Sequence, residues 1–230
     1  MPVIEVEEVD HAYGDGSSRR SVLEEVTVRL TEQRIGVIGA NGSGKSTFVR
    51  LLNGLVLPDR GRVRVDGLDT RREGREVRRR VGFCFTDPDA QIVMPTVAED
   101  IGFGLRRRGL SRTQVRERVA AALTAYGLAD HADHPAHLLS GGQKQLLALA
   151  SVLVTEPRVL VLDEPTTLLD LRNAAMVAGM VRELPQQVLL VTHHLELLDG
   201  FDRVLVFDGG RIVFDGSADE AATFYRKLVT

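Results

Sequence analysis

A glycine-rich segment, GANGSGKST at residues 39–47, has the composition and spacing of a phosphate-binding loop. It lies between a predicted buried strand, residues 34–38, and a predicted helix that begins at Lys45. Glycines let backbone N–H groups turn toward phosphate oxygens, and the helix N-terminus adds partial positive charge. We expect Lys45 to contact the β- and γ-phosphates of a nucleotide and the Ser46 hydroxyl to ligate Mg²⁺. The residues expected to bind the nucleotide in this loop are Gly39, Asn41, Gly42, Ser43, Gly44, Lys45, Ser46 and Thr47.

Two carboxylates follow a second apolar run. Residues 159–162 read VLVL, which is typical of a buried parallel strand, and Asp163 and Glu164 come directly after it. Parallel sheets bind ligands at the carboxyl ends of their strands. We therefore expect Asp163 to hold Mg²⁺, through water, and Glu164 to orient or deprotonate an attacking water. Capping of a helix is the alternative role for such a pair, and the phosphate loop makes the catalytic role the better interpretation.

The segment LSGGQKQ at residues 139–145 predicts a second helix terminus suited to an anion. One nucleotide cannot use both termini of one subunit if they lie far apart. Two copies facing head to tail would solve this, because each copy would complete the other's site. The residues expected to contact the γ-phosphate of the opposite copy are Ser140, Gly141, Gly142 and Gln143. Simple helix capping is the alternative.

The spacing of apolar residues predicts an α/β fold. Residues 188–192 repeat the buried-strand pattern, and residues 204–214 read as a hairpin around a Gly-Gly turn. Residues 62–67 alternate like an exposed edge strand, and residues 111–126 predict an amphipathic helix. Strands alternate with helices at both ends of the chain, and a more helical block lies at about 87–150, which suggests a helical insertion in an α/β core.

Composition narrows the class of protein further. The chain has 230 residues and a net charge of −3, so nothing suggests nucleic acid as a partner. The sequence shows no signal peptide and no apolar run long enough to span a bilayer. We therefore expect any function at a membrane to require a partner protein. The single cysteine, Cys84, lies in an apolar strand and is expected to be a core residue. Arginines cluster at 71–80 and again at Arg106, Arg107, Arg108 and Arg112, as solvated faces or as contacts with a partner or lipid headgroups.

The segments GANGSGKST, LSGGQKQ and VLVLDEPT, in this order, resemble those of ATP-binding-cassette ATPases, and the resemblance covers nearly all of the chain. It implies a P-loop NTPase core with a mainly parallel sheet, an antiparallel β subdomain and a helical subdomain at about 87–150, all within one domain of residues 1–230. It also implies ATP and Mg²⁺ as cofactors and hydrolysis of ATP. By this resemblance Tyr13 stacks on adenine, Asp170 lies in the loop that links two nucleotide sites, and His193 contacts the γ-phosphate. His194 receives no catalytic role.

The stretch after the strand VGFCF departs from the usual family pattern. The family usually carries a glutamine where this chain has Thr86, whose side chain is too short to reach as far. Gln91, five residues later, resembles the glutamine on a short helix in ATPases of energy-coupling-factor transporters. Asp87 or Asp89 can cap such a turn. We expect Gln91 and Ile92 to project from a movable element that relays nucleotide state to a transmembrane coupling protein. An ordinary surface turn is the alternative.

The same stretch is most similar to the ATPases of biotin-specific energy-coupling-factor transporters, and those for cobalt or nickel are the alternative. A soluble ATPase of the family without a transport role is the alternative from another class. The expected partners are a second ATPase, in a homodimer or pseudo-dimer, a transmembrane coupling protein and a substrate-binding membrane protein, at the cytoplasmic face of the membrane. Pro135 breaks any helix that would align His131, His134 and His137, so a metal site there is not expected.

Overall fold

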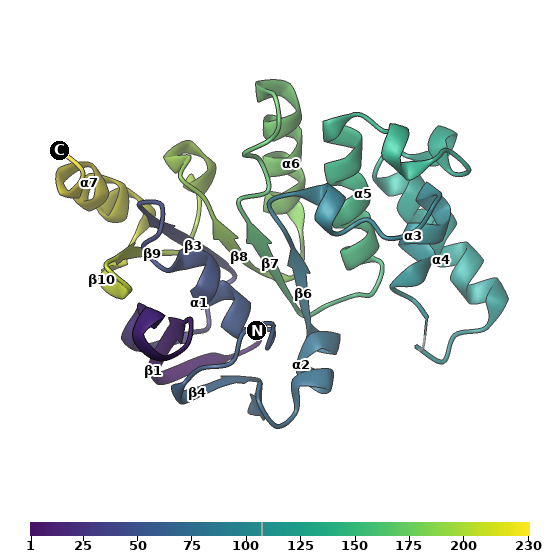
Figure 1. Cartoon of the computed structure of the whole chain (residues 1–230). Coiled ribbons are helices and arrows are strands. Elements are labelled where there is room, and N and C mark those ends of the chain that lie inside the picture. The colour runs from purple at the N-terminus through teal and green to yellow at the C-terminus, as the bar shows by residue number, and fades with distance from the viewer. Residues whose placement is uncertain (107) are drawn as a thin grey trace. The chain divides into compact units, whose positions relative to one another are not determined.

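The all-apolar segments of the sequence form the parallel part of a sheet (Figure 1). The computed structural model describes residues 1–106 and 108–230, so Arg107 of the second arginine cluster lies outside the described residues. The described chain divides into two units. The first comprises Met1–Val81, Arg158–Asp163 and Leu184–Thr230, and the second comprises Gly82–Pro157 and Glu164–Glu183.

In the first unit, five strands of the larger sheet lie in the order β10-β9-β3-β8-β7. They are β3 (Arg34–Gly39), β7 (Val159–Asp163), β8 (Gln187–Val191), β9 (Arg203–Asp208) and β10 (Arg211–Gly216). Strand β3 runs parallel to β8 and β9, and β7 runs parallel to β8, whereas β10 is antiparallel to β9. Every residue of β3, β7 and β8 is buried, as expected of parallel strands covered on both faces. The strands and the hairpin predicted here are confirmed.

The N-terminal strands form a separate antiparallel sheet in the order β2-β1-β4-β5. They are β1 (Ile4–Tyr13), β2 (Arg20–Leu30), β4 (Arg60–Val65) and β5 (Leu68–Asp69). The prediction of an exposed edge strand at 62–67 is wrong, because β4 lies between β1 and β5. The alternation of apolar and polar residues indicates only which side chains face the core, here Val63 and Val65. It does not indicate which strands lie next to β4.

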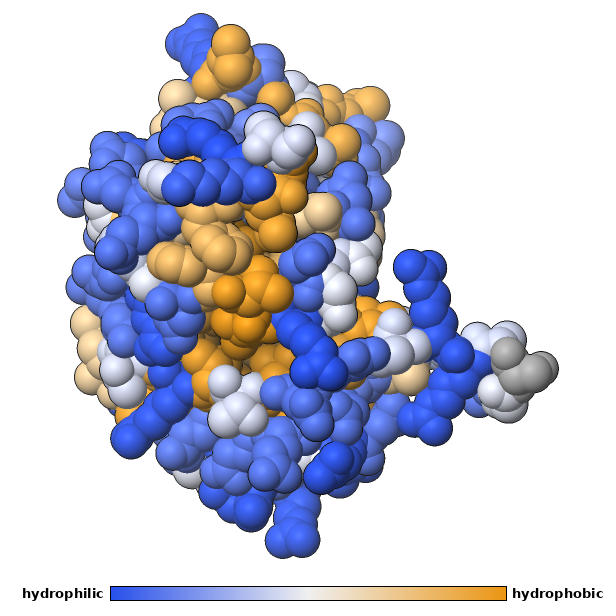
Figure 2. Space-filling model, turned by 90° about the vertical axis from the view of Figure 1, so that its left-hand side faces the viewer, coloured by the Kyte–Doolittle hydropathy of each residue, from blue (hydrophilic) through white to orange (hydrophobic). Residues whose placement is uncertain are grey.

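Helices complete the first unit. They are α1 (Lys45–Leu51), α2 (Gly74–Arg80) and α7 (Ala218–Leu228), with short 3-10 turns η1 (Gly16–Ser18) and η5 (Leu195–Leu198). Helix α1 packs against β3, β7 and β8, which fixes its first turn at the carboxyl ends of these strands. On the face seen in Figure 2, hydrophobic residues gather in a central band among hydrophilic ones. Exposed apolar side chains of β10 and of the C-terminal end include Val213, Leu228 and Val229.

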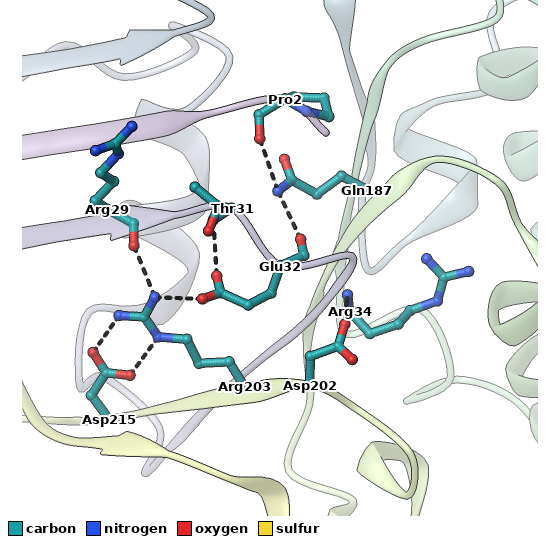
Figure 3. Close-up of polar contacts among 9 residues, drawn as sticks. All are labelled: Pro2, Arg29, Thr31, Glu32, Arg34, Gln187, Asp202, Arg203 and Asp215. Atoms are coloured by element: carbon teal, nitrogen blue, oxygen red, sulfur yellow. Dashed lines mark hydrogen bonds and ion pairs between the residues drawn. The ribbon is translucent and has the colours of Figure 1, made fainter.

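A polar network fixes the chain just before β3 (Figure 3). Arg203 binds both carboxylate oxygens of Asp215 at 2.6 Å and donates to Glu32 at 3.0 Å. The hydrogen bonds to Asp215 raise the pKa of the Arg203 guanidinium. Gln187, which is fully buried, donates to the carbonyl oxygens of Glu32 at 2.8 Å and Pro2 at 3.3 Å. The segment that leads into β3 is thereby held to β8, β9 and β10, which sets the register of the strand that ends in the glycine-rich loop.

The second unit is largely helical. It begins within β6 (Val81–Cys84) and contains α3 (Val97–Phe103), α4 (Arg112–Ala125), α5 (Gly141–Leu153), α6 (Leu171–Glu183) and the turns η2 (Pro88–Ala90), η3 (Ala129–His131) and η4 (Ala136–Leu138). The predicted helix 111–126 is confirmed: Ser111 caps α4 through a reciprocal capping box, and Gly127, at φ +66°, follows its end. Among the residues described, no helix is both long and apolar enough to cross a membrane.

Candidate nucleotide-binding site

The glycine-rich loop connects β3 to α1, as predicted. Gly44 takes the N-cap position of α1 at φ +104°, a conformation that L side chains rarely adopt. A Cβ on Gly44 would lie 2.8 Å from the carbonyl oxygen of Val22, and one on Gly39 would collide with the carbonyl oxygen of Phe207. The neighbouring backbone therefore leaves room only for glycine at positions 39 and 44. The backbone of Phe207 and of Val22 thus restricts both ends of the loop.

Lys45 lies inside this loop. Its side chain is buried, and its ammonium group donates to the carbonyl oxygens of Gly39 and Ala40, each at 2.8 Å. Ser43 is also buried, and its hydroxyl has no hydrogen-bond partner among the described residues. Buried polar groups are nearly always paired, so a hydroxyl without a partner in a loop with a buried lysine fits a loop that binds an anion. The loop fits the phosphates of a nucleotide on this observation.

Two oxygen atoms suited to Mg²⁺ lie next to each other at the end of the sheet. Ser46 Oγ donates to Asp163 Oδ1 at 2.9 Å, and the Asp163 side chain is 1% exposed. Hydroxyl and carboxylate oxygens are the ligands that Mg²⁺ prefers, so the pair fits this ion. Arg50 Nη2 lies 3.4 Å from Asp163 Oδ2. Arg50 was not among the predicted site residues, although it lies one helical turn after Ser46 and so on the same face of α1.

Tyr13, the last residue of β1, also lies beside this helix. Its hydroxyl is 3.4 Å from Thr47 Oγ1, and the side chain remains half-exposed. Its ring meets His11 edge to face with centroids 4.7 Å apart. His11 is buried, and neither ring nitrogen is hydrogen-bonded within the described chain. The arrangement holds an aromatic face beside the first turn of α1.

The predicted switch histidine follows β8. His193 is exposed, and its ring lies against that of His194 with centroids 4.1 Å apart. His194 Nδ1 lies 3.3 Å from a carboxylate oxygen of Glu196. His193 also lines a hollow of about 730 Å³ between η5 and α7. His193 thus belongs to the first unit, together with the glycine-rich loop, Ser46 and Asp163.

Glu164 belongs to the second unit. Its backbone has φ +52°, and its carboxylate accepts a hydrogen bond from Thr167 Oγ1 at 2.8 Å. A residue other than glycine in this region costs about 1–3 kcal/mol, and such strain clusters at functional sites. Glu8, Glu25, Asp66 and Glu156 also have positive φ, so the backbone conformation of Glu164 does not by itself indicate a functional role.

The LSGGQ segment forms the start of α5. Ser140 is the N-cap, and it exchanges a capping box with Gln143: Ser140 Oγ accepts from Gln143 N at 3.3 Å and Gln143 Oε1 accepts from Ser140 N at 2.9 Å. Because the Gln143 oxygen faces Ser140, its amide nitrogen donates to His131 Nε2 at 3.0 Å. Helix capping is therefore one role of Ser140, and Ser140 and Gly141 remain exposed. Within the described part of the chain, no three His, Cys, Asp or Glu residues come together as a set of metal ligands.

Asp170 caps the next helix of this unit. Its carboxylate accepts from Asn173 N at 2.8 Å and from Asn173 Nδ2 at 3.0 Å at the start of α6. A Cβ on Gly142 would lie 2.6 Å from Cγ of the Asn173 side chain, so Gly142 packs directly on it. The structure thus joins Asp170 to the LSGGQ segment through Asn173. Sequence reasoning missed Asn173, although its spacing of three residues after Asp170 is a capping signal.

The turn that carries Gln91 differs from the expectation. Asp87 does cap it, since its side chain accepts from Asp89 N at 2.9 Å. The prediction that Gln91 and Ile92 project from the turn is wrong. Gln91 Oε1 accepts from Phe85 N at 3.1 Å, Gln91 Nε2 donates to the Ala148 carbonyl at 2.9 Å, and Ile92 is half-buried. The exposed apolar residue here is Val93, which is 61% exposed.

Comparisons with known proteins agree with this geometry. The family model described as "ABC transporter" matches residues 23–167. The chain is 51% identical over 209 residues to the "Biotin transport ATP-binding protein BioM" of Rhizobium etli, covering 91% of this chain and 93% of that one. It is 44% identical over 231 residues to the "Energy-coupling factor transporter ATP-binding protein EcfA1" of Symbiobacterium thermophilum, covering 95% and 80%.

A solved structure extends the likeness to three dimensions. The structure of cbiO1 from Clostridium perfringens, described as part of the ABC transporter complex cbiONQ, matches with a TM-score of 0.82 and 33% identity. The match covers 98% of this chain and 92% of that one. Together with a phosphate loop whose lysine is buried and a sheet that mixes parallel and antiparallel strands, these matches identify the α/β fold. The chain belongs to the ABC transporter family, as an ATP-binding and ATP-hydrolysing member.

Proposed function

We propose that the chain is the ATPase subunit of an energy-coupling-factor importer and that the imported solute is biotin. The observation that carries the proposal is the turn at 87–92 fastened to α5 by Gln91, in a chain similar over nine-tenths of its length to a biotin transport ATP-binding protein. Thr86 stands where the family usually has a glutamine, and the Gln91 side chain links the backbone of Phe85 to that of Ala148 within the helical unit.

The chain's own residues perform the binding steps. Tyr13 stacks on adenine, and the loop residues Gly39 to Thr47 hold the phosphates through backbone N–H groups and Lys45. Ser46, and Asp163 through water, would hold Mg²⁺, and this ion would neutralise charge on the phosphate oxygens. Glu164 orients the attacking water and accepts its proton, and His193 stabilises the charge that develops on the γ-phosphate.

Two copies complete each other's sites in this proposal. The start of α5 in one copy binds the γ-phosphate held by the other copy, because the helix N-terminus supplies partial positive charge. The residues that make this contact are Ser140, Gly141, Gly142 and Gln143. Asp170 connects the two sites. The whole chain, residues 1–230, acts as one ATPase domain whose helical subdomain spans about 87–150. The dimer is formed by identical copies or by this chain and a related ATPase.

The remaining partners are membrane proteins. A transmembrane coupling protein contacts the turn at 87–92, and a substrate-binding membrane protein supplies the solute, with this chain at the cytoplasmic face. The cbiO1 protein of Clostridium perfringens, described as part of a transporter complex, supports this arrangement. An importer of cobalt or nickel is the second candidate, because the stretch after the strand VGFCF also resembles the ATPases of such transporters. Nucleic acid plays no part in the proposal.

A tagged copy purified from solubilised native membranes tests the proposal. Recovery of two small membrane proteins is expected, and recovery of soluble proteins, DNA or ribosomes instead would contradict it. Labelled biotin and labelled cobalt, offered separately to the purified complex, then decide the solute: retention of biotin supports the first candidate, and retention of cobalt supports the second.

A further inference from the structure

One face of α5 carries three residues that contact the segment from η2 to α3. Lys144, Ala148 and Ser151 follow one another at spacings of four and three, so they lie along the same side of the helix. Each of them contacts the chain between residues 89 and 100. The start of this helix carries Ser140 and the glycines of the LSGGQ segment. The segment and the helix are therefore joined along most of the helix length.

The first contact is an ion pair. Lys144 Nζ lies 2.7 Å from Asp89 Oδ1 and 3.0 Å from Asp89 Oδ2, and the Lys144 side chain is only 16% exposed. Lys144 N also donates to the Ser140 carbonyl at 2.8 Å, in the first turn of α5. The same residue therefore connects the turn η2 through its side chain and the N-cap of α5 through its backbone.

The second and third contacts extend the fastening. Gln91 uses both ends of its amide, one on Phe85 N and one on the Ala148 carbonyl. Asp100, which is 4% exposed, accepts from Val93 N at 2.9 Å and Met94 N at 3.0 Å through one oxygen, and from Ser151 Oγ at 2.9 Å through the other. A buried carboxylate with three donors holds its position strongly. A push on the exposed turn around Val93 must therefore move α5 as well.

We propose that Lys144 is a positioning residue that, through its ion pair with Asp89, makes the turn at 87–92 and the LSGGQ end of α5 move as one body. The inference rests on the proposed function, because it assumes that a membrane partner acts on this turn. Gln91 and Asp100 hold the middle and far end of the helix, and the ion pair holds the end that contacts the γ-phosphate of the opposite copy. Loss of the pair would loosen Ser140 from the turn without touching the glycine-rich loop.

Charge reversal tests this inference. Asp89→Lys, Lys144→Asp and the double variant are purified alone and in complex with their membrane proteins. The measured quantity is the rate of ATP hydrolysis in the complex divided by the rate of the isolated chain. We expect each single variant to lower this ratio about fivefold, as suits one ion pair, and the double variant to restore most of it. The rate of the isolated chain and its unfolding midpoint should stay close to those of the unchanged chain, which a purely structural role would not allow.

A matched control comes from the same unit. Arg118 Nη1 lies 3.2 Å from Glu156 Oε1, with the arginine on α4, so Arg118→Glu and Glu156→Arg reverse a comparable pair away from the turn. These variants should leave the ratio unchanged. If a reversal variant fails to fold, Lys144→Gln removes the charge and keeps an unbranched polar side chain. This variant should lower the same ratio of rates.

The outcomes separate the two proposals. Single variants with an unchanged ratio, or a double variant as defective as the singles, would overturn the role of Lys144 while leaving the importer intact. If the chain without any substitution purifies from membranes with no membrane protein bound, the proposed function is overturned, and this inference with it.

Discussion

Substitution of Gly142 by alanine should destabilise the helical unit, whereas the same change at Gly141 should not. A Cβ at position 142 would lie 2.6–2.7 Å from three atoms of the Asn173 side chain, and a Cβ at 141 would meet nothing within 4 Å. Asn173 cannot turn aside without cost, because Asp170 accepts hydrogen bonds from both its backbone and its side chain.

The magnitude follows from opposing effects. Forcing a methyl group into a packed site costs about 1–3 kcal/mol. Replacing glycine within a helix by alanine stabilises it by about 0.5–1 kcal/mol. Gly142→Ala should therefore lower the free energy of unfolding by up to about 2.5 kcal/mol, and Gly141→Ala should leave it unchanged or raise it by up to about 1 kcal/mol.

Urea unfolding of the nucleotide-free chain, followed by circular dichroism, measures both values. Asn173→Ala provides the internal check: with the clash removed, Gly142→Ala in this background should no longer be destabilising. Equal stability of the two alanine variants would refute the packing argument. A Gly142→Ala penalty that persists without the Asn173 side chain would show that the cost arises elsewhere.

Three further predictions concern the first unit and the end of β6. Burial raises the pKa of the Cys84 thiol to about 12, so at pH 8 roughly one molecule in ten thousand carries the thiolate. Ellman's reagent should therefore react with Cys84 only after the chain unfolds, and rapid reaction in the folded chain would contradict the burial. Tyr13→Ala should weaken MgATP binding about tenfold by titration calorimetry, and Tyr13→Phe should not, because stacking needs the ring alone. Arg203→Ala should lower the free energy of unfolding by about 1–3 kcal/mol, because it leaves Asp215 without its bidentate partner. Arg211→Ala, which removes only exposed ion pairs, should leave the free energy of unfolding nearly unchanged, and equal losses in the two variants would refute the importance of the network.

Local patterns predicted the elements that depend on local forces. The strand at 34–38, the loop after it and the helix at 111–126 with its Ser111 cap are encoded within a few residues of where they form. The apolar run at 159–162 likewise gave a buried parallel strand with Asp163 at its end. These elements could be predicted because a run of apolar residues and a helix cap each depend on residues that are close together in the sequence.

Contacts between distant residues could not be predicted in this way. Gln91 binds the carbonyl of Ala148, 57 residues away, and nothing in the sequence around either residue indicates it. The place of β4 inside its sheet depends on β1, and β2, β3 and α1 lie between these two strands in the chain. The contact of Asn173 with Gly142 likewise requires two helices to be packed before it exists. Each of these follows from tertiary packing, which residue types alone do not specify.

The most direct test of the importer account is uptake of labelled biotin by the purified complex in lipid vesicles. The account predicts uptake that requires MgATP on the side of this chain and that Glu164→Gln abolishes, while that variant still binds ATP and accumulates as a dimer. Uptake that continues in the Glu164→Gln variant, or that proceeds equally without ATP, would contradict the claim that ATP hydrolysis by this chain drives transport.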